Sequence, residues 1–205
     1  MKIISHRGFW QTPEEKNAIS AFDRTVADGF GTETDVRDFL GDLVISHDPA
    51  VGNPIPWSAV VDRFDGTGLE LAVNVKADGL SSALAASFAG RNVHWFAFDM
   101  SGPEMWRYKN AGLPYYTRHS DIEPDPILYG DAAGVWLDAF EDTWFDAEVI
   151  TSHLESGKSV CVVSSELHGR DPLLLWQMLK PVRDRNGLTI CTDKPLDVRR
   201  FLFDD

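Results

Sequence analysis

Two histidines and two acidic residues in the first fifty positions have the types and spacing for proton transfer on a charged substrate. Apolar runs end at His6 and at His47, and the apolar segment between them carries Glu33 and Asp35. Side chains two residues apart on a strand point to the same side, so both carboxylates are expected to face one space. Arg7 follows the first histidine directly. This combination favours acid/base chemistry on a phosphorylated substrate, assisted by a divalent cation.

Short apolar runs and helical segments alternate along the whole chain. The apolar runs predict strands at 2–5, 30–36, 69–75, 94–98, 115–118, 134–137, 159–163 and 188–191. Segment 43–46 is expected to return as a hairpin and to end at His47. Helices are predicted at 17–28, 81–89, 103–110, 146–155, 172–182 and 197–203, with a weak one at 54–63 and at most a short one at 126–129.

The composition of the predicted strands indicates how they associate. They are rich in Val, Ile, Leu and Phe and do not alternate cleanly, which is typical of a parallel sheet covered by helices. Eight β/α units without a linker-like break predict one domain over residues 1–205, an α/β fold with a single closed (β/α)8 TIM barrel. A doubly wound open sheet is the alternative, and the lack of a Gly-rich nucleotide fingerprint after the first strand disfavours it.

Polar residues close the predicted strands at their carboxyl ends, where barrels of this kind have their active sites. The barrel mouth is therefore the predicted pocket. Beyond the five residues introduced first, this position is occupied by Asn74, Lys76, Asp99, Arg118, His119, Asp138, Glu166 and Asp193. We expect Asp99, Arg118, Glu166 and His168 to line the pocket, together with Trp10 after the first strand.

The overall composition narrows the classes of function. A hydrophobic fraction of 43% suffices for a core, and a net charge of −13 disfavours nucleic acid and anionic membranes as partners, because both require clustered Lys and Arg. No apolar run approaches a membrane span, and the N-terminus lacks a signal-peptide core. Cys161 and Cys191 lie in apolar runs and are expected to be buried free thiols, with a disulfide or a metal pair as the alternative. We expect a cytoplasmic protein without integral membrane association; the oligomeric state stays open.

Six short motifs lie at or near the ends of the predicted strands. They are His6-Arg7-Gly8, Pro13-Glu14-Glu15-Lys16-Asn17, Glu33-Thr34-Asp35, His47-Asp48, Asn74-Val75-Lys76 and Thr192-Asp193-Lys194-Pro195. With these motifs the chain resembles the glycerophosphodiester phosphodiesterase family, within the superfamily that includes phosphatidylinositol-specific phospholipase C. The family pattern is H-R-G, a P-E-N-T-like segment, E-x-D, H-D, E-x-K and a late T-D-x-P. The resemblance spans nearly the whole chain.

The chain departs from the family pattern at two places. Its P-E-N-T-like segment is altered and slightly stretched, and Asn74 replaces a glutamate that usually binds metal. The chain is also short, which makes it look like a compact, divergent member.

The resemblance implies that His6 and His47 are a general acid/base pair. One histidine would deprotonate a substrate hydroxyl that attacks phosphorus, and the other would protonate the departing alkoxide. The cyclic phosphate that forms could then be hydrolysed. The alternative is that both histidines are held by backbone hydrogen bonds at the barrel mouth.

The acidic pair predicts a metal site. Glu33 and Asp35 repel one another, and a hard cation, Mg²⁺ or Ca²⁺, bound by both carboxylates and by Asn74 would resolve this. The alternative is a metal-free network in which Arg7 and Lys76 neutralise them. Those two side chains are also the expected ligands of the substrate phosphate. Asp193 is expected to cap the last helix or to orient a neighbouring side chain.

The resemblance therefore implies a phosphoric diester hydrolase acting on a small glycerophosphodiester-like substrate, with a role in lipid metabolism. Two alternatives stay open. One is a metal-independent, phospholipase C-like phosphotransfer that ends at the cyclic phosphate. The other is a non-catalytic barrel that binds a phosphorylated metabolite.

Overall fold

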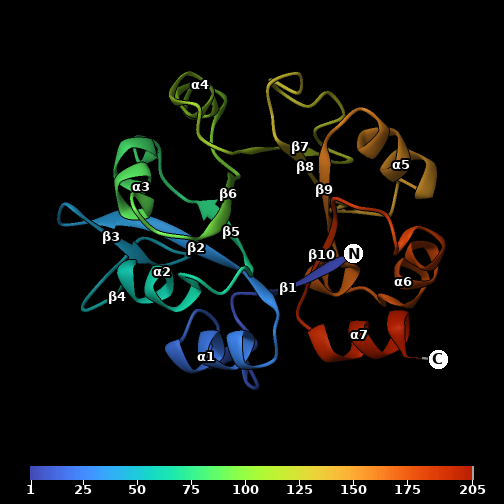
Figure 1. Cartoon of the computed structure of the whole chain (residues 1–205), viewed down its shortest axis with the longest axis horizontal. Helices are drawn as coiled ribbons and strands as arrows, with labels where there is room; N and C mark the ends of the chain where they lie inside the picture. Colours follow the sequence, from blue (N-terminus) through green and yellow to red (C-terminus); the bar gives the residue numbers. More distant parts are fainter. Residues whose placement is uncertain (205) are drawn as a thin grey trace.

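Eight parallel strands form a closed ring, shown end-on in Figure 1. The computed structural model describes residues 1–204. Hydrogen-bonded pairs connect each strand to the next along most of the ring, and a bridge between Ala97 and Tyr115 closes the last gap, where the Ala97 N–H donates to the Pro114 carbonyl over 3.0 Å. The predicted single barrel is confirmed and the open sheet is wrong. In ring order the strands are β1 (Lys2–His6), β2 (Gly31–Phe39), β5 (Glu70–Val75), β6 (His94–Phe98), β7 (Tyr116–His119), β8 (Gly134–Leu137), β9 (Ser159–Val163) and β10 (Leu188–Thr192).

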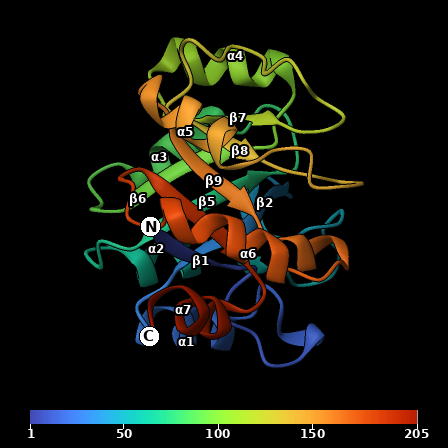
Figure 2. The same cartoon turned by 90° about the vertical axis from the view of Figure 1, so that its right-hand side faces the viewer.

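Helices surround the ring, as the two perpendicular views show (Figures 1 and 2). Some begin at side-chain caps that the sequence supplies: the Asp146 carboxylate accepts the N–H groups of Glu148 and Val149 over 2.9 and 3.1 Å at the start of α5. The helices are α1 (Ile19–Ala27), α2 (Ser58–Phe64), α3 (Ser81–Phe88), α4 (Gly102–Ala111), α5 (Ala147–Glu155), α6 (Leu173–Leu179) and α7 (Pro195–Phe203), with short 3-10 turns η1 (Pro13–Glu15), η2 (Ser165–His168) and η3 (Lys180–Val182).

A hairpin extends β2 beyond the ring. β3 (Asp42–Ile45) runs antiparallel to the end of β2, and β4 (Ile55–Pro56) pairs with β3. The return of β3 brings its end back to the mouth, where the Ser46 N–H donates to the Asp35 carbonyl over 3.3 Å. His47 follows directly, so the hairpin places this histidine beside the acidic pair of β2.

The connection from β7 to β8 contains no helix, so the short helix considered at 126–129 is wrong. These residues form turns, with Leu128 at a φ of 53°. A local fold held by side chains replaces the helix: the Thr117 hydroxyl donates to the Ile127 carbonyl over 2.7 Å, and the Tyr115 hydroxyl to the Leu128 carbonyl over 3.2 Å. These bonds satisfy backbone carbonyls that a helix would have satisfied internally.

Aromatic side chains fill the inside of the ring. The Phe96 ring stacks on Tyr116 with centroids 3.6 Å apart, and Phe98 stacks on Trp136 with centroids 3.7 Å apart. Cys161 and Cys191 lie in the same core cluster as buried free thiols, as predicted, and burial raises the pKa of both. Two further apolar clusters pack the helices against the outside of the ring. The filled interior leaves the mouth as the place for polar chemistry.

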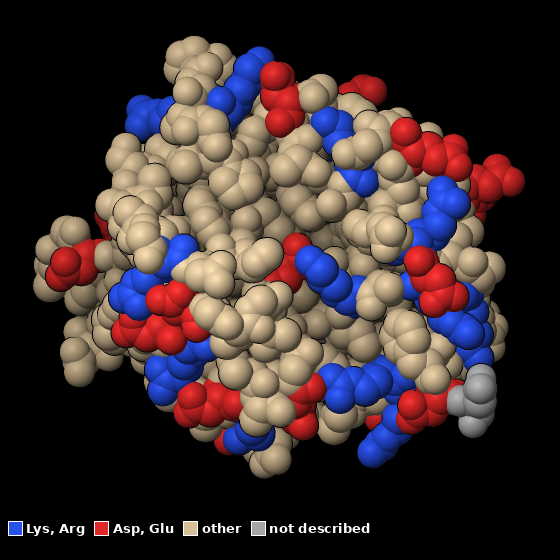
Figure 3. Space-filling model, in the orientation of Figure 1, with Lys and Arg blue, Asp and Glu red and all other residues tan. Residues whose placement is uncertain are grey.

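Charged residues of both signs alternate around the edge of the face in Figure 3. The net charge of −13 therefore does not gather into one acidic surface on this side. None of the helices within residues 1–204 has the length and hydrophobicity that a bilayer crossing requires.

Candidate active site

His6 lies between two carboxylates at the mouth. In the parallel pairing of β1 with β2 it is in register with Glu33, and its Nε2 is 3.9 Å from the Glu33 carboxylate. Its other ring nitrogen, Nδ1, is 2.8 Å from Asp193, which follows β10. The pKa of Asp193 is lowered, because the hydrogen bond and charge of His6 and the charge of Lys16 outweigh the opposing effect of burial. The ionised Asp193 carboxylate accepts a hydrogen bond from Nδ1–H, which leaves Nε2 as the ring nitrogen that faces Glu33.

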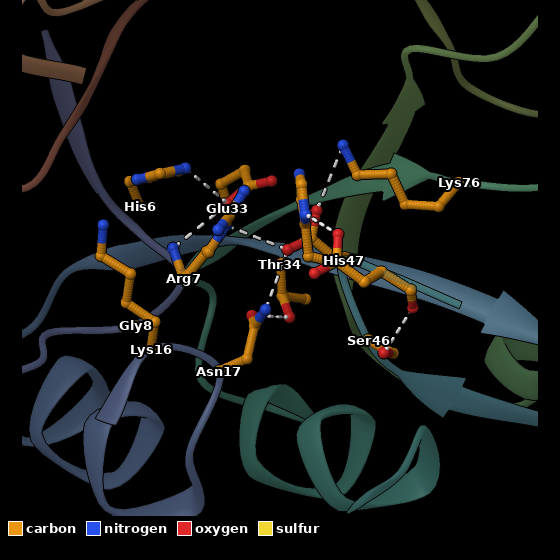
Figure 4. A network of polar contacts seen from close by, with 12 residues as sticks. His6, Arg7, Gly8, Lys16, Asn17, Glu33, Thr34, Ser46, His47 and Lys76 are labelled. Carbon is orange, nitrogen blue, oxygen red and sulfur yellow. Dashed lines mark hydrogen bonds and ion pairs between the residues drawn. The ribbon is translucent and has the colours of Figure 1, made fainter. Parts of the chain in front are cut away.

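Asp35 is fully buried and holds two cationic side chains at the mouth. Its carboxylate is 3.0 Å from Arg7 Nε and 3.4 Å from Lys76 Nζ, and it accepts a hydrogen bond from the Asn17 amide over 2.8 Å. Asn74 is its register partner on β5. In Figure 4 Arg7 lies close to Glu33, and Lys76 extends toward them from the side opposite His6. The structure thus brings together all the residues expected to bind phosphate and metal.

A strained backbone places Arg7. Its φ of 57° is in the left-handed region, which non-glycine residues rarely adopt, and its N–H donates to the backbone and side-chain oxygens of Glu33 over 2.9 and 3.1 Å. Gly8, with a φ of 83°, has to be glycine, because a Cβ there would be 2.7 Å from the Ala21 Cβ. The His-Arg-Gly sequence therefore makes a sharp exit from β1 that turns His6 and Arg7 into the mouth.

His47 is less confined than His6. Its side chain is 45% exposed, and its Nδ1 is 3.0 Å from the exposed Asp48 carboxylate. Arg37 fixes its backbone by donating to the His47 carbonyl over 3.0 Å. In Figure 4 His47 lies on the Lys76 side of Glu33 and His6 on the other side. Both histidines are at the same end of the barrel, which the proposed chemistry requires.

A chain of ion pairs continues around the other half of the mouth. Lys76 Nζ is 4.0 Å from Asp99, Asp99 pairs with Arg118, and Arg118 Nη1 is 3.7 Å from Asp138. Asp138 in turn accepts from His168 Nε2 over 2.7 Å. The expected lining residues of this half therefore lie on one rim, and Asp138 is the carboxylate that links Arg118 to His168.

Glu166 and Trp10 support His6 indirectly. The Glu166 carboxylate accepts from the Asp193 N–H over 3.1 Å and from the Thr192 hydroxyl, which fixes the loop that carries Asp193. The Trp10 indole donates to the His6 carbonyl over 3.2 Å. Asp193 thus orients a neighbouring side chain, whereas the cap position of α7 is Lys194 and has no side-chain cap.

Asn17 is the site residue that sequence reasoning did not assign. Its amide donates to Asp35 and its amide oxygen accepts from Thr34 over 2.8 Å, so it fixes the buried carboxylate. The available signal was its place as the asparagine that ends the Pro13–Asn17 motif.

The oxygen atoms of this site suit a hard divalent cation. Asp35 Oδ1 and Asn74 Oδ1 are buried and accept no hydrogen bond. Burial and the neighbouring Asp35 carboxylate raise the pKa of Glu33 to about 7, as expected for two acids without sufficient counter-charge. No group of three or more His, Cys, Asp or Glu side chains within residues 1–204 could hold a metal, and a site completed by Asn74 would not belong to that class. The donor set therefore fits Mg²⁺ or Ca²⁺ through oxygen ligands.

Glu33→Gln is expected to make the fold more stable than the wild type at pH 8 in the presence of a chelator. The folded pKa of about 7 is above the model-peptide value of 4.5, so the stabilisation from protonated Glu33 is complete below pH 4.5 and is lost as the pH rises to about 7. The free energy of unfolding of the wild type is expected to fall by about 3 kcal/mol over this pH range. Urea denaturation of both proteins between pH 4.5 and 8 measures it. Parallel pH profiles for the two proteins would contradict the raised pKa.

Comparisons with known proteins identify the fold. No protein-family profile matches the sequence, and no curated protein matches it. Two solved structures match the fold over nearly their whole length. A phosphodiesterase from Oleispira antarctica in complex with the product sn-glycerol-3-phosphate has a TM-score of 0.71 and 15% identity over 98% of this chain and 96% of that one. A glycerophosphodiester phosphodiesterase from Agrobacterium tumefaciens has a TM-score of 0.70 and 17% identity over 97% and 99%. At these identities the match shows a shared fold.

Proposed function

We propose that the protein is a phosphoric diester hydrolase acting on a small glycerophosphodiester-like substrate. The observation that carries the proposal is the convergence of a His6–Asp193 pair, two buried carboxylates, Arg7 and Lys76 at one barrel mouth. The shared fold supports it, because both matched structures are phosphodiesterases and one contains sn-glycerol-3-phosphate as its product.

His6 and His47 transfer the protons in this proposal. One of them takes the proton from a substrate hydroxyl while that oxygen bonds to phosphorus. The phosphorus–oxygen bond to the departing alcohol breaks, and the other histidine gives its proton to the alkoxide. Water then opens the cyclic phosphate, with the same two groups acting in reverse. The Asp193 carboxylate keeps the proton of His6 on Nδ1, so Nε2 is the atom that exchanges a proton with substrate.

Arg7 and Lys76 bind the phosphate oxygens. Their side chains are only 21% and 18% exposed, and in the free protein both contact Asp35. A phosphodiester in the mouth offers them a second anionic partner at low cost, since neither has to be desolvated again.

A divalent cation, Mg²⁺ or Ca²⁺, completes the proposed site, with Glu33, Asp35 and Asn74 as its ligands. When bound, it would neutralise the two carboxylates and polarise a phosphoryl oxygen. With the carboxylates neutralised in this way, Arg7 and Lys76 would be free to turn from Asp35 to the substrate. Two buried oxygens support this assignment: Asn74 Oδ1 accepts no hydrogen bond, and Asp35 Oδ1 has only its 3.4 Å ion pair with Lys76.

Turnover of simple phosphodiesters with and without chelator tests the function. We expect hydrolysis of glycerophosphocholine, glycerophosphoethanolamine or glycerophosphoglycerol with Mg²⁺ or Ca²⁺, reduced by about 100-fold or more in excess EDTA. Phosphorus NMR identifies the products, and a His6→Ala preparation purified identically controls for contaminating activity. Full activity in EDTA with accumulation of a cyclic phosphate would replace this mechanism by metal-independent phosphotransfer. Tight binding of sn-glycerol-3-phosphate without turnover of any diester would indicate a binding protein.

We further propose a cytoplasmic location and a role in lipid metabolism. The two buried free thiols support a reducing compartment. The chemistry of glycerophosphodiesters, which arise when phospholipids lose their acyl chains, supports the metabolic role.

A further inference from the structure

The helix-free connection between β7 and β8, residues 120–133, is held to the barrel by a few specific contacts. We call it the latch segment. Two of these contacts are the hydrogen bonds that Thr117 and Tyr115 donate to its carbonyls. A third is the ion pair between Glu123 and Arg118, with the Glu123 carboxylate 3.2 Å from Arg118 Nε. The end of the segment is held separately: Lys158 Nζ donates to the Gly130 and Ala132 carbonyls over 2.9 and 2.7 Å, and the Ala133 N–H donates to the Tyr115 carbonyl over 2.9 Å.

The latch segment reaches the candidate active site. Together with β7, the loop that follows β6 and the start of α4, it borders a cavity of about 300 Å³, which Asp99, Arg118 and Glu123 line. Its Asp121 carboxylate also accepts the N–H groups of Phe140 and Glu141 over 2.9 and 2.7 Å, which fixes the next loop of the mouth. A displaced segment would remove one wall of the cavity and one counter-charge of Arg118.

Two histidines connect this segment to α5. His119, at the end of β7, has its Nδ1 3.0 Å from Nε2 of His153 on α5. The second nitrogen of His153, Nδ1, is 2.9 Å from the hydroxyl of Tyr129 in the latch segment. His153 is 9% exposed, and the edge of the Trp144 ring packs against His119 with centroids 4.5 Å apart. A continuous hydrogen-bonded chain thus runs from β7 through α5 to the latch segment.

The hydrogen bond between the two rings requires one proton between the facing nitrogens of His119 and His153. When both rings are neutral, one nitrogen donates and the other accepts, and Tyr129 can donate or accept at the far side of His153. One extra proton leaves this arrangement intact, because a singly charged pair still has one acceptor between the rings. When both rings are charged, two N–H groups oppose each other over 3.0 Å. The contact then becomes repulsive.

The surroundings offer little to stabilise that second charge. Burial and the proximity of His119 lower the pKa of His153 to about 4, and burial lowers the pKa of His119 despite the Pro124 carbonyl and the Asp125 carboxylate. On the Tyr129 side lies the positively charged Lys158 ammonium, 5.3 Å from the centre of the Tyr129 ring. Asp125 is thus the only acid identified as acting on the pair within residues 1–204.

We propose that the His119–His153 pair is an acid-sensitive latch that holds the 120–133 segment against α5 and releases it when both rings are protonated. Both folded pKa values are below the usual 6.5, so the stabilisation is complete above about pH 6.5 and is lost as the pH falls toward 4. The release opens the cavity beside Arg118 and exposes the mouth on that side. The latch is a property of the fold and does not depend on which reaction the mouth catalyses.

Hydrogen exchange of the full-length protein at pH 7.5 and pH 5.0, compared as protection factors, tests the latch. The second proton opposes the contact: with a His153 pKa of about 4 in the closed state against the usual 6.5, the open state gains nearly tenfold per pH unit below 6.5. We therefore expect a loss of protection of about tenfold or more at pH 5.0. The loss should be confined to 120–133 and the last turn of α5, which carries His153. His153→Gln keeps hydrogen-bonding groups but does not titrate, so it should show no such loss. His94→Gln, an exposed histidine at the start of β6, is the matched control and should behave as wild type.

Three outcomes would overturn the proposal. They are equal protection of the segment at both pH values in the wild type, the same acid-induced loss in His153→Gln, or a loss spread over the whole barrel. If His153→Gln does not fold, His119→Gln provides the same comparison, because it removes the titrating partner on the other side of the contact.

Discussion

Replacement of His6 by alanine is expected to reduce phosphodiester turnover by about 10²- to 10⁴-fold while the protein stays folded. The imidazole is the best-positioned proton carrier of the mouth, held by Asp193 at 2.8 Å with its Nε2 directed to Glu33. Its backbone contacts, which include the bond from the Trp10 indole to the His6 carbonyl, do not involve the side chain. Steady-state kinetics with thermal unfolding monitored by circular dichroism measures both effects.

The same experiment with His47→Ala tests the second proton carrier. We expect a comparable loss of turnover, with an even smaller effect on folding because this side chain is 45% exposed. His94→Ala is the matched control, since His94 is exposed at the start of β6, away from the mouth. Wild-type rates in either His6→Ala or His47→Ala would exclude the two-histidine mechanism.

Replacement of Asp35 by alanine is expected to remove metal affinity and turnover together and to destabilise the fold. The carboxylate is fully buried, and its loss leaves Arg7 and Lys76 without their counter-charge and Asn17 without its acceptor. Loss of one partner from a buried ion-pair network typically costs about 3–5 kcal/mol. For a chain of this size that lowers the melting temperature by roughly 10 °C.

Isothermal titration with Mg²⁺ and Ca²⁺, at a temperature where the variant is folded, separates the two effects of Asp35→Ala. Asp38→Ala is the matched control, because Asp38 is on the same strand but exposed. An unchanged metal titration in Asp35→Ala would show that the cation is bound elsewhere. Asp35→Asn, which retains the volume of the side chain, tests the ligand assignment if the alanine variant does not fold.

The sequence predicted the barrel because the underlying signals are local. Apolar runs of four to seven residues, separated by helical segments, mark each strand without knowledge of its neighbours. The rule that strand ends carry the active site then selected His6, Glu33, Asp35 and Lys76, and the structure places all four at the mouth. The helix predicted at 126–129 is wrong: the side chains of Thr117 in β7 and of Tyr115, just before it, satisfy the carbonyls of Ile127 and Leu128.

The pairings among the site residues came only from the tertiary structure. His6 and Asp193 are separated by 187 positions, and no local pattern reveals that β10 lies beside β1 and orients that imidazole. The contact between His119 and His153 likewise joins residues 34 positions apart, at the end of β7 and on α5. Residue type and strand position thus determined which side chains reach the mouth, because both are encoded along the chain. Closure of the ring decided which of them touch, because contact between distant strands depends on the whole barrel.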